Sequence, residues 1–172
     1  MSKKSGVVIV LAMHGTPPRD FPKEERKELF ELRARLKHVE RLEAALIARR
    51  DFLERKMRAW PRTKENDAFH FGSMELGADL SSQSGWPVVV GFNEFCDPDL
   101  DKAIGDAVHL TTGKVVVTTP MMTRGGGHSK GDIPEAIRRV QQQHPDTEIV
   151  YAWPFPVPAI AKFLSDQIQA FL

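Results

Sequence analysis

The sequence predicts an α/β fold built around a parallel β-sheet. Four short apolar runs are rich in β-branched residues, are too short for helices and lack polar alternation, as is typical of strands buried on both faces. A helical pattern follows each run, and this repeat favours parallel strands joined by right-handed crossovers. The expected strands are Val7–Met13, Pro87–Phe92, Lys114–Met121 and Glu148–Trp153.

Start signals or apolar spacing mark the helices that follow the last three strands. Asp97 and Pro98 are interpreted as an N-cap and a first-turn proline that open a helix over Asp99–Leu110. Residues 132–135 (DIPE) have the pattern of a capping box with a proline, which predicts the start of the next helix. Apolar residues at helical spacing predict a last helix over Pro158–Leu172.

The connection between the first two strands is far longer than a β–α crossover needs. It spans about 70 residues, whereas a few loop residues and one helix suffice. No Gly or Pro lies between Lys23 and Trp60. Apolar residues recur there every three or four positions, which predicts one helix of about 37 residues and about 55 Å. These positions are Leu29, Leu32, Leu36, Val39, Leu42, Leu46, Leu53, Met57 and Trp60.

Pro61 is expected to end this long helix, and a second helical stretch is expected over residues 64–82. We therefore interpret the chain as one domain, 1–172, with a helical insertion over 20–85. A helix of this length is longer than a small sheet can cover. We therefore expect part of the insertion to form a helical hairpin that packs on another subunit. A hairpin that folds back on its own domain is the alternative.

Composition and charge exclude several classes of protein. The 172 residues include 24 Lys and Arg against 23 Asp and Glu, so the net charge of +1 predicts no general attraction to nucleic acid or to membranes. No apolar stretch approaches the ~20 residues of a membrane span, and the apolar run near the N-terminus lacks the cleavage pattern of a secretory signal. Cys96 is the only cysteine, which excludes an internal disulfide. We expect a cytoplasmic protein.

Residues able to bind a metal follow three of the predicted strands. His14 follows the first strand, Glu94 the second, and Gly125–Gly127 with His128 the third. Ligands bind beyond the carboxyl ends of parallel strands, so these residues converge if the strands are neighbours. Two imidazoles and a carboxylate suit Fe(II), Co(II), Ni(II) or Zn(II), with positions left open for substrate. Taken singly, each has a plainer interpretation: structural hydrogen-bonding histidines, a solvated glutamate, and a flexible turn or phosphate nest for the glycines.

Three stretches of the chain together resemble a known family. They are VVIVLAMHGT (7–16), VVVGFNEFCDPDLDKAIGDAV (88–108) and KVVVTTPMMTRGGGHSKGDIPEAIRRVQQQHPDTEIVYAWPFPV (114–157). In residue identity, order and spacing they are similar to the sirohydrochlorin cobaltochelatase/ferrochelatase family, the small class II tetrapyrrole chelatases. The resemblance covers essentially everything except the insertion.

The resemblance implies a flavodoxin-like sheet of strand order 2-1-3-4, with His14, Glu94 and His128 at the metal and active-site positions. It implies an enzyme, a lyase that inserts Co²⁺ or Fe²⁺, with Ni²⁺ as a further option, into sirohydrochlorin or a related macrocycle for cobalamin or siroheme biosynthesis. The metal is then a substrate, and no organic cofactor is expected. Larger members resemble two such halves facing each other across a cleft, so we expect a homodimer.

Sirohydrochlorin carries many carboxylates, so cations and N–H donors are expected near the site. Arg124, Lys130 and the backbone of Gly125–Gly127 are the candidate substrate-binding groups, with solvated surface charges as the plainer interpretation of the two cations. A non-catalytic metal or tetrapyrrole carrier that uses the same three ligands is the alternative function. Phosphoglycerate-mutase-like phosphatases also place His-Gly after a first strand, but they need an Arg directly before the His, where this chain has Met13.

Overall fold

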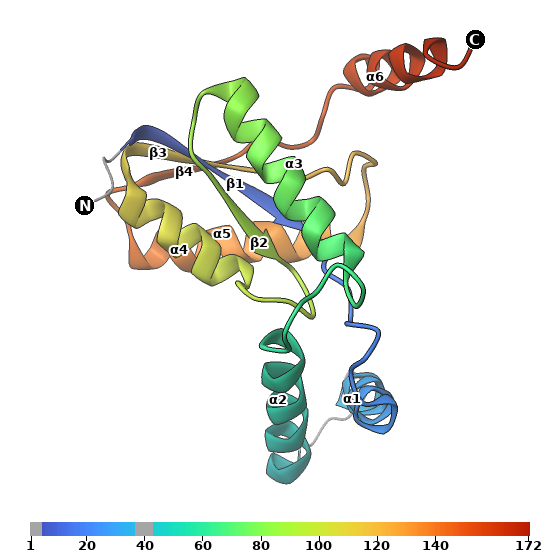
Figure 1. Ribbon diagram of the computed structural model, residues 1–172. Helices are drawn as coiled ribbons and strands as arrows, with labels where there is room; N and C mark the ends of the chain where they lie inside the picture. Colours follow the sequence, from blue (N-terminus) through green and yellow to red (C-terminus); the bar gives the residue numbers. More distant parts are fainter. Residues whose placement is uncertain (1–4, 37–42) are drawn as a thin grey trace.

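The computed structural model describes residues 5–36 and 43–172 and contains a four-stranded parallel sheet (Figure 1). Its order is β2-β1-β3-β4, so the predicted α/β class and the strand order 2-1-3-4 are confirmed. The first strand of the chain therefore lies inside the sheet, between the second and the third. The strands are β1 (Ser5–Met13), β2 (Val88–Phe92), β3 (Thr111–Thr118) and β4 (Glu148–Tyr151).

Helices cover both faces of this sheet. The described helices are α1 (Lys23–Leu36), α2 (Ala44–Arg58), α3 (Ala68–Ser84), α4 (Leu100–Leu110), α5 (Ile133–Gln143) and α6 (Val157–Gln169), and a π-helical turn, η1 (His128–Asp132), directly precedes α5. Of these, α4 and α5 lie on one face of the sheet and α3 lies on the other. Side chains of β1 alternate between two cores: Val8 and Val10 pack with α4 and α5, whereas Leu11 packs on the face that α3 covers. No helix among the described residues is long and apolar enough to cross a membrane.

Close backbone packing explains two glycines inside these elements. A Cβ atom on Gly77 of α3 would come within 2.6 Å of Val90 in β2, and one on Gly91 of β2 would come within 2.5 Å of Ala103 in α4. Both helices therefore approach β2 more closely than a side chain would allow. This packing keeps the carboxyl end of β2 in a fixed position.

The structure corrects both predicted helix caps. Asp97 does not cap α4, because Asp99 accepts the backbone N–H of Lys102 at 2.8 Å and Pro98 lies in the preceding loop. Asp132 makes no cap hydrogen bond, since η1 runs directly into α5 and leaves no free helix N-terminus there. The expected capping box is therefore wrong.

The third strand also ends earlier than predicted, at Thr118 rather than Met121. Pro120 has no N–H group to donate to a strand ladder, so pairing cannot continue through it. The result is a longer loop, residues 119–127, between β3 and η1.

A pair of helices replaces the predicted single helix of about 37 residues. α1 ends at Leu36, and α2 begins after Glu43, whose backbone is extended; Val39 and Leu42 of the predicted seam lie outside the described residues. Two shorter helices can bury their apolar faces against each other, whereas one straight helix would leave its seam in water. The prediction of one long helix is wrong.

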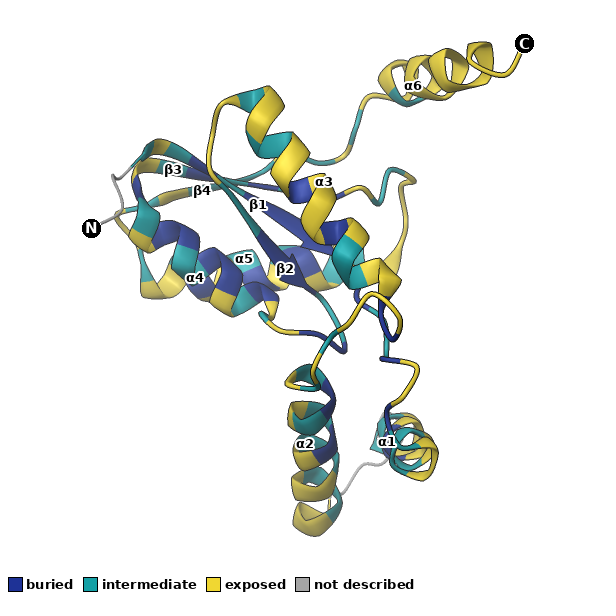
Figure 2. Cartoon of the chain, viewed as in Figure 1, coloured by how far each residue is buried: buried dark blue, intermediate teal, exposed yellow. Residues whose placement is uncertain are grey.

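We call α1 and α2 together the helical hairpin. Figure 2 shows the buried side of each helix turned toward the other. Their shared core contains Phe21, Leu29, Leu32, Leu53, Met57 and Phe95. Phe95 belongs to the loop after β2, so the hairpin packs on its own domain, as the alternative interpretation expected. The division into one domain with an insertion at 20–85 stays a prediction, and α3 within that segment packs on β2.

The last helix, α6, extends away from the sheet (Figure 1). The predicted helix is present, but none of its residues is buried. Its large apolar side chains and those just after it are exposed, namely Val157, Phe163, Leu164, Ile168, Phe171 and Leu172. An amphipathic helix normally buries its apolar face, but no part of the chain that the structure describes covers this face.

Candidate active site

Three side chains from separate parts of the sequence meet at the carboxyl edge of the sheet. His14 directly follows β1, Glu94 lies in the loop after β2, and His128 opens η1 after β3. Each contributes one ligand atom, and these three atoms lie within 4.8 Å of one another. Among the described residues, they form a cluster that could hold a metal ion. The strand order accounts for this meeting, because β2 and β3 both pair with β1. The expected convergence is therefore present in the structure.

The hydrogen bonds of the two imidazoles orient them toward each other. His14 Nδ1 lies 2.8 Å from the carbonyl oxygen of Gly15, and His128 Nδ1 lies 2.5 Å from Asp132 Oδ2. Since both partners are acceptors, both Nδ1 atoms are assigned the proton, and each neutral ring keeps its lone pair on Nε2. The two Nε2 atoms are 3.1 Å apart, and His128 Nε2 is 3.6 Å from Glu94 Oε2.

These distances suit a shared cation. Two lone pairs that face each other repel unless a proton or metal lies between them. Nitrogen and oxygen ligands at about 2.0–2.2 Å from a tetrahedral ion lie roughly 3.3–3.6 Å from each other. The separations of 3.1 and 3.6 Å lie close to that range, and all three ligand atoms lie within 4.8 Å of one another, so His14, His128 and Glu94 can hold one divalent ion and leave a position open.

Backbone contacts fix the two loops that carry His14 and Glu94. The N–H of Glu94 donates to the carbonyl of His14 at 2.9 Å, which continues the β1–β2 ladder by one step. Gly15 has φ +92°, and a Cβ atom there would lie 1.9 Å from the carbonyl oxygen of Glu94. Asn93 donates both its backbone and its side-chain N–H to the carbonyl of Met13. The two loops therefore form one rigid unit.

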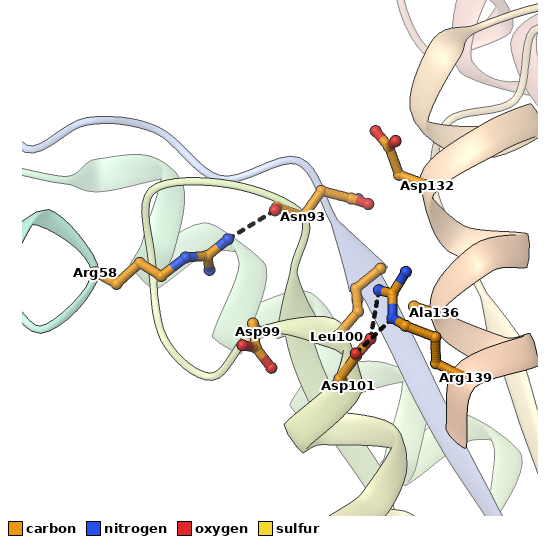
Figure 3. A pocket seen from close by; sticks show the side chains of 8 residues that line it. All are labelled: Arg58, Asn93, Asp99, Leu100, Asp101, Asp132, Ala136 and Arg139. Carbon is orange, nitrogen blue, oxygen red and sulfur yellow. Dashed lines mark hydrogen bonds and ion pairs between the residues drawn. The ribbon is translucent and has the colours of Figure 1, made fainter. Parts of the chain in front are cut away.

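The hairpin and the segment after it hold the Glu94 loop from the other side. Figure 3 shows Arg58 of α2 reaching Asn93, where its guanidinium donates to the backbone carbonyl at 2.9 Å. Arg62 donates to the carbonyl of Phe95 and to the carboxylate of Asp67 at 2.7 Å. The Arg62–Asp67 pair is almost fully buried, with side chains 7% and 1% exposed. Removing either partner would leave an uncompensated charge inside the protein.

Hollows flank the three convergent side chains. On the hairpin side, a polar cavity of about 370 Å³ is lined by Arg33, Leu36, Arg50, Glu54, Asn93, Glu94 and Asp132. A smaller cavity of about 170 Å³ adjoins it and shares Asn93 and Asp132 (Figure 3). On the α6 side, a more apolar cavity of about 530 Å³ is lined by Pro120, Met121, Met122, Thr123, Gly126, Gly127, His128, Ser129, Ile160 and Leu164.

The predicted substrate-binding groups lie near this apolar side. Gly126 and Gly127 line the same cavity as His128, and Arg124 lines an adjoining cavity of about 440 Å³ beside α6. Gly125, whose φ is +94°, and the exposed Lys130 line neither of these two cavities. The loop therefore presents backbone donors and a cation next to the site, but a substrate role for them stays a prediction.

Sequence reasoning missed Asp132 and Tyr151 as supports of His128. Asp132 lies four residues after His128 on the same helical face, a spacing that could have revealed the pair. Tyr151 donates its hydroxyl to the carbonyl of Ser129 at 3.0 Å, which ties η1 to the end of β4. Burial raises the pKa of Tyr151 to about 12, so this hydroxyl keeps its proton at neutral pH.

Cys96, two residues after Glu94, is a buried packing residue rather than a third kind of ligand. Cys96 is 2% exposed, and its thiol lies 3.2 Å from His70 Nδ1 and packs with β2. Burial raises the pKa of this thiol to about 11 and lowers the pKa of His70. Both groups are therefore neutral near pH 7, and Cys96 is not among the three clustered ligands.

Comparison with known proteins places the chain in a family. Residues 72–170, more than half of the chain, match the CbiX family. The chain belongs to the CbiX family. The part that matches CbiX contains Glu94 and His128, whereas His14 and the hairpin precede it.

Individual relatives of this CbiX chain are 16% to 31% identical to it in the aligned regions. A sirohydrochlorin cobaltochelatase from Methanopyrus kandleri is 31% identical over 106 residues, which cover 49% of this chain and 73% of that protein. The sirohydrochlorin chelatase SirB from Bacillus subtilis subspecies spizizenii, solved in complex with cobalt, is 17% identical with a TM-score of 0.43; the alignment covers 86% of this chain and 43% of SirB. A CbiX protein of cobalamin (vitamin B12) biosynthesis from Marinobacter aquaeolei VT8 is 16% identical with a TM-score of 0.45, over 95% of each chain. The family assignment rests on the CbiX match and on the Methanopyrus relative.

Proposed function

We propose that the chain is a metallochelatase that inserts a divalent metal ion, Co²⁺ or Fe²⁺, into sirohydrochlorin or a related tetrapyrrole. The observation that carries this proposal is the pair of Nε2 atoms, 3.1 Å apart, that His14 and His128 turn toward each other beside Glu94. The Methanopyrus relative, a sirohydrochlorin cobaltochelatase, supports cobalt as the metal and sirohydrochlorin as the macrocycle. The expected cytoplasmic location stays a prediction.

The same two histidines can both deliver the metal and remove protons. Insertion exchanges one M²⁺ for the two pyrrolic N–H protons of the macrocycle, so two protons must be accepted. As each imidazole releases the metal, its Nε2 lone pair becomes free to accept one of these protons, and neutral imidazole is a suitable base near pH 7. Asp132 and the carbonyl of Gly15 stabilise the resulting imidazolium rings. A base placed in this way contributes about 10²–10⁴-fold to a rate.

The walls of the site suit a flat macrocycle with acidic substituents. The apolar cavity beside His128 offers Met121 and Met122 to the face of the ring. Arg124, Lys130 and the N–H groups of Gly125–Gly127 are the donors that we assign to peripheral carboxylates. Charged, planar hydrogen-bond donors such as the Arg124 guanidinium bind carboxylates in a bidentate way.

Anaerobic turnover with sirohydrochlorin and Co(II) tests this function directly. We expect the absorbance of the free macrocycle to convert to that of the metal complex at many equivalents per chain, and parallel reactions with Fe(II) and Ni(II) rank the metals. The alternative, a metal or tetrapyrrole carrier, predicts tight binding and no more than one metallated macrocycle per chain. That stoichiometry would reject the chelatase.

Replacing Asp132 with alanine is expected to weaken metal binding by about 10–100-fold, because a carboxylate behind a histidine ligand fixes its ring and raises its basicity. Cobalt(II) titration of the purified chain measures the effect. Glu135→Ala removes an acid one turn along, whose ion-pair partner among the described residues is Arg139, and should leave the affinity unchanged. Equal affinities for the two variants would show that the Asp132–His128 contact does not support the metal.

We further propose that the active form is a homodimer in which α6 packs on a second copy. The apolar cavities beside His128 are lined by Ile160 and Leu164 of α6 and are partly open to solvent. The remaining apolar residues of α6 are exposed, with Phe163 at 55% and Ile168 at 56%. A partner that covers this face would both bury it and enclose the macrocycle.

Leu164→Glu is therefore expected to convert the dimer to a monomer in sedimentation velocity, with the dimer dissociation constant raised about 30-fold or more because a charge becomes buried in an apolar interface. Gln169→Glu adds the same charge to the polar side of α6 and serves as the control. A wild-type chain that is monomeric at high micromolar concentration would reject this assembly.

A further inference from the structure

The helical hairpin contributes a cation to the candidate active site. The Arg33 guanidinium of α1 donates to Glu94 Oε1 at 2.8 Å and to Glu54 Oε1 of α2 at 2.7 Å. It also lies over the ring of Phe95, with the guanidinium carbon 4.7 Å from the ring centroid. The side chain is 21% exposed, so these contacts are partly shielded from water.

The two oxygens of the Glu94 carboxylate have different partners. Oε1 is bound by Arg33, and Oε2 faces His128 Nε2 at 3.6 Å. Arg33 therefore orients Glu94 toward the imidazoles and, at the same time, places a positive charge next to the position of a divalent ion. The positive charges of the guanidinium and of a bound divalent ion repel each other, and partial burial increases this repulsion.

We propose that Arg33 is a positioning residue that keeps Glu94 a weak metal ligand, so that the metal is held loosely enough to pass to the macrocycle. Glu54 moderates the effect, because it binds the same guanidinium and neutralises part of its charge. This inference rests on the proposed chelatase function and gives the hairpin a role in it. Arg33 is not expected to touch the macrocycle.

The physical reason is that this metal is a substrate and must leave its protein ligands. A site that stabilises the bound ion as strongly as possible lowers the starting state and so raises the barrier to transfer. A cation held against one ligand reduces that stabilisation without changing the positions of the three ligands. Arg33 therefore has opposite effects on metal affinity and on the rate of transfer.

Cobalt(II) titration in the absence of any tetrapyrrole tests the affinity part. Arg33→Met removes the charge but keeps the length and apolar stem, and the dissociation constant for Co(II) is expected to fall about tenfold, the effect of removing a unit charge about 6 Å from a divalent ion even in water. Glu54→Gln removes the negative charge that partly neutralises Arg33. The full positive charge of Arg33 then acts on Glu94, and the dissociation constant for Co(II) should rise about threefold to tenfold. Arg49→Met is the matched control, since Arg49 lies on the same hairpin and, among the described residues, forms its ion pair with Glu28 and lies over the ring of Phe52.

A single-turnover reaction of chain preloaded with Co(II) tests the transfer part. Arg33→Met should bind more tightly and yet transfer its metal to sirohydrochlorin about tenfold more slowly than wild type, whereas Arg33→Lys, which keeps the charge, should recover most of the wild-type rate. If Arg33 only supports the fold, Arg33→Met will bind Co(II) more weakly, and this overturns the inference.

Should Arg33→Met fail to fold by circular dichroism, the Glu54→Gln titration decides alone, because unchanged or tighter binding of Co(II) by Glu54→Gln contradicts the proposal. Failure of the chelatase proposal itself looks different, since the wild-type chain would then yield no more than one metallated macrocycle per chain, whatever its affinity for Co(II).

Discussion

Replacing His128 with alanine is expected to lower the rate of metal insertion by about 10²–10⁴-fold, the contribution of a well-placed base, and to reduce Co(II) affinity as well. The Nε2 atom of His128 contacts both other ligands of the cluster, at 3.1 Å to His14 Nε2 and 3.6 Å to Glu94 Oε2. No other imidazole nitrogen in the described residues meets both groups. Initial rates with sirohydrochlorin and Co(II), together with a cobalt titration, measure both losses.

The fold of this variant should be unaffected, because the His128 side chain is 23% exposed and lies outside the three hydrophobic cores. His109→Ala is the matched control, since His109 lies on α4 and pairs with His144. It should retain both insertion and metal binding. A folded His128→Ala chain that inserts metal at near the wild-type rate would remove His128 from the mechanism.

Much of the sheet and the meeting of its loops could be predicted because both depend on local patterns. Short β-branched runs identify buried strands, and the β-α repeat makes those strands parallel. Once the strand order is known, the residues directly after β1, β2 and β3 must lie at one edge, which is why His14, Glu94 and His128 were identified. The order itself came from family resemblance, since alternation of strands and helices is compatible with several orders.

The helical hairpin shows where local pattern is insufficient. An apolar residue every three or four positions is equally consistent with one long helix and with two helices that face each other. The choice depends on burial, because Leu29 and Leu32 of α1 gain Leu53, Met57 and the loop residue Phe95 as neighbours only when the chain turns back. Nothing in the spacing of these residues indicates that partner.

The partners of charged residues were missed for a related reason. Asp132 was interpreted as part of a helix cap, and nothing in the sequence singled out Arg33. Their actual partners, His128 and Glu94, are supplied by the tertiary structure. A carboxylate or guanidinium takes whichever partner the fold places nearest, and sequence periodicity does not contain that information.

The second large effect is expected from Gly15→Ala, which should weaken Co(II) binding by about tenfold or more and slow insertion by about 10²-fold. The added methyl group would lie 1.9 Å from the carbonyl oxygen of Glu94, an impossible distance, so the loops that carry His14 and Glu94 must separate. A displacement of about 1 Å in a catalytic group is enough for a loss of this size.

Gly85→Ala separates this steric effect from backbone strain. Gly85 ends α3 with φ +76°, close to the +92° of Gly15, but a Cβ atom there meets nothing within 4 Å. Both variants should lose about 1–2 kcal/mol of stability from the left-handed conformation alone, measured by chemical denaturation, and Gly15→Ala should lose more because of the collision. Only Gly15→Ala should lose the metal site. If the two variants bind cobalt equally well, the close contact between Gly15 and Glu94 does not set the ligand geometry, and the separation of the two loops has no bearing on the chemistry.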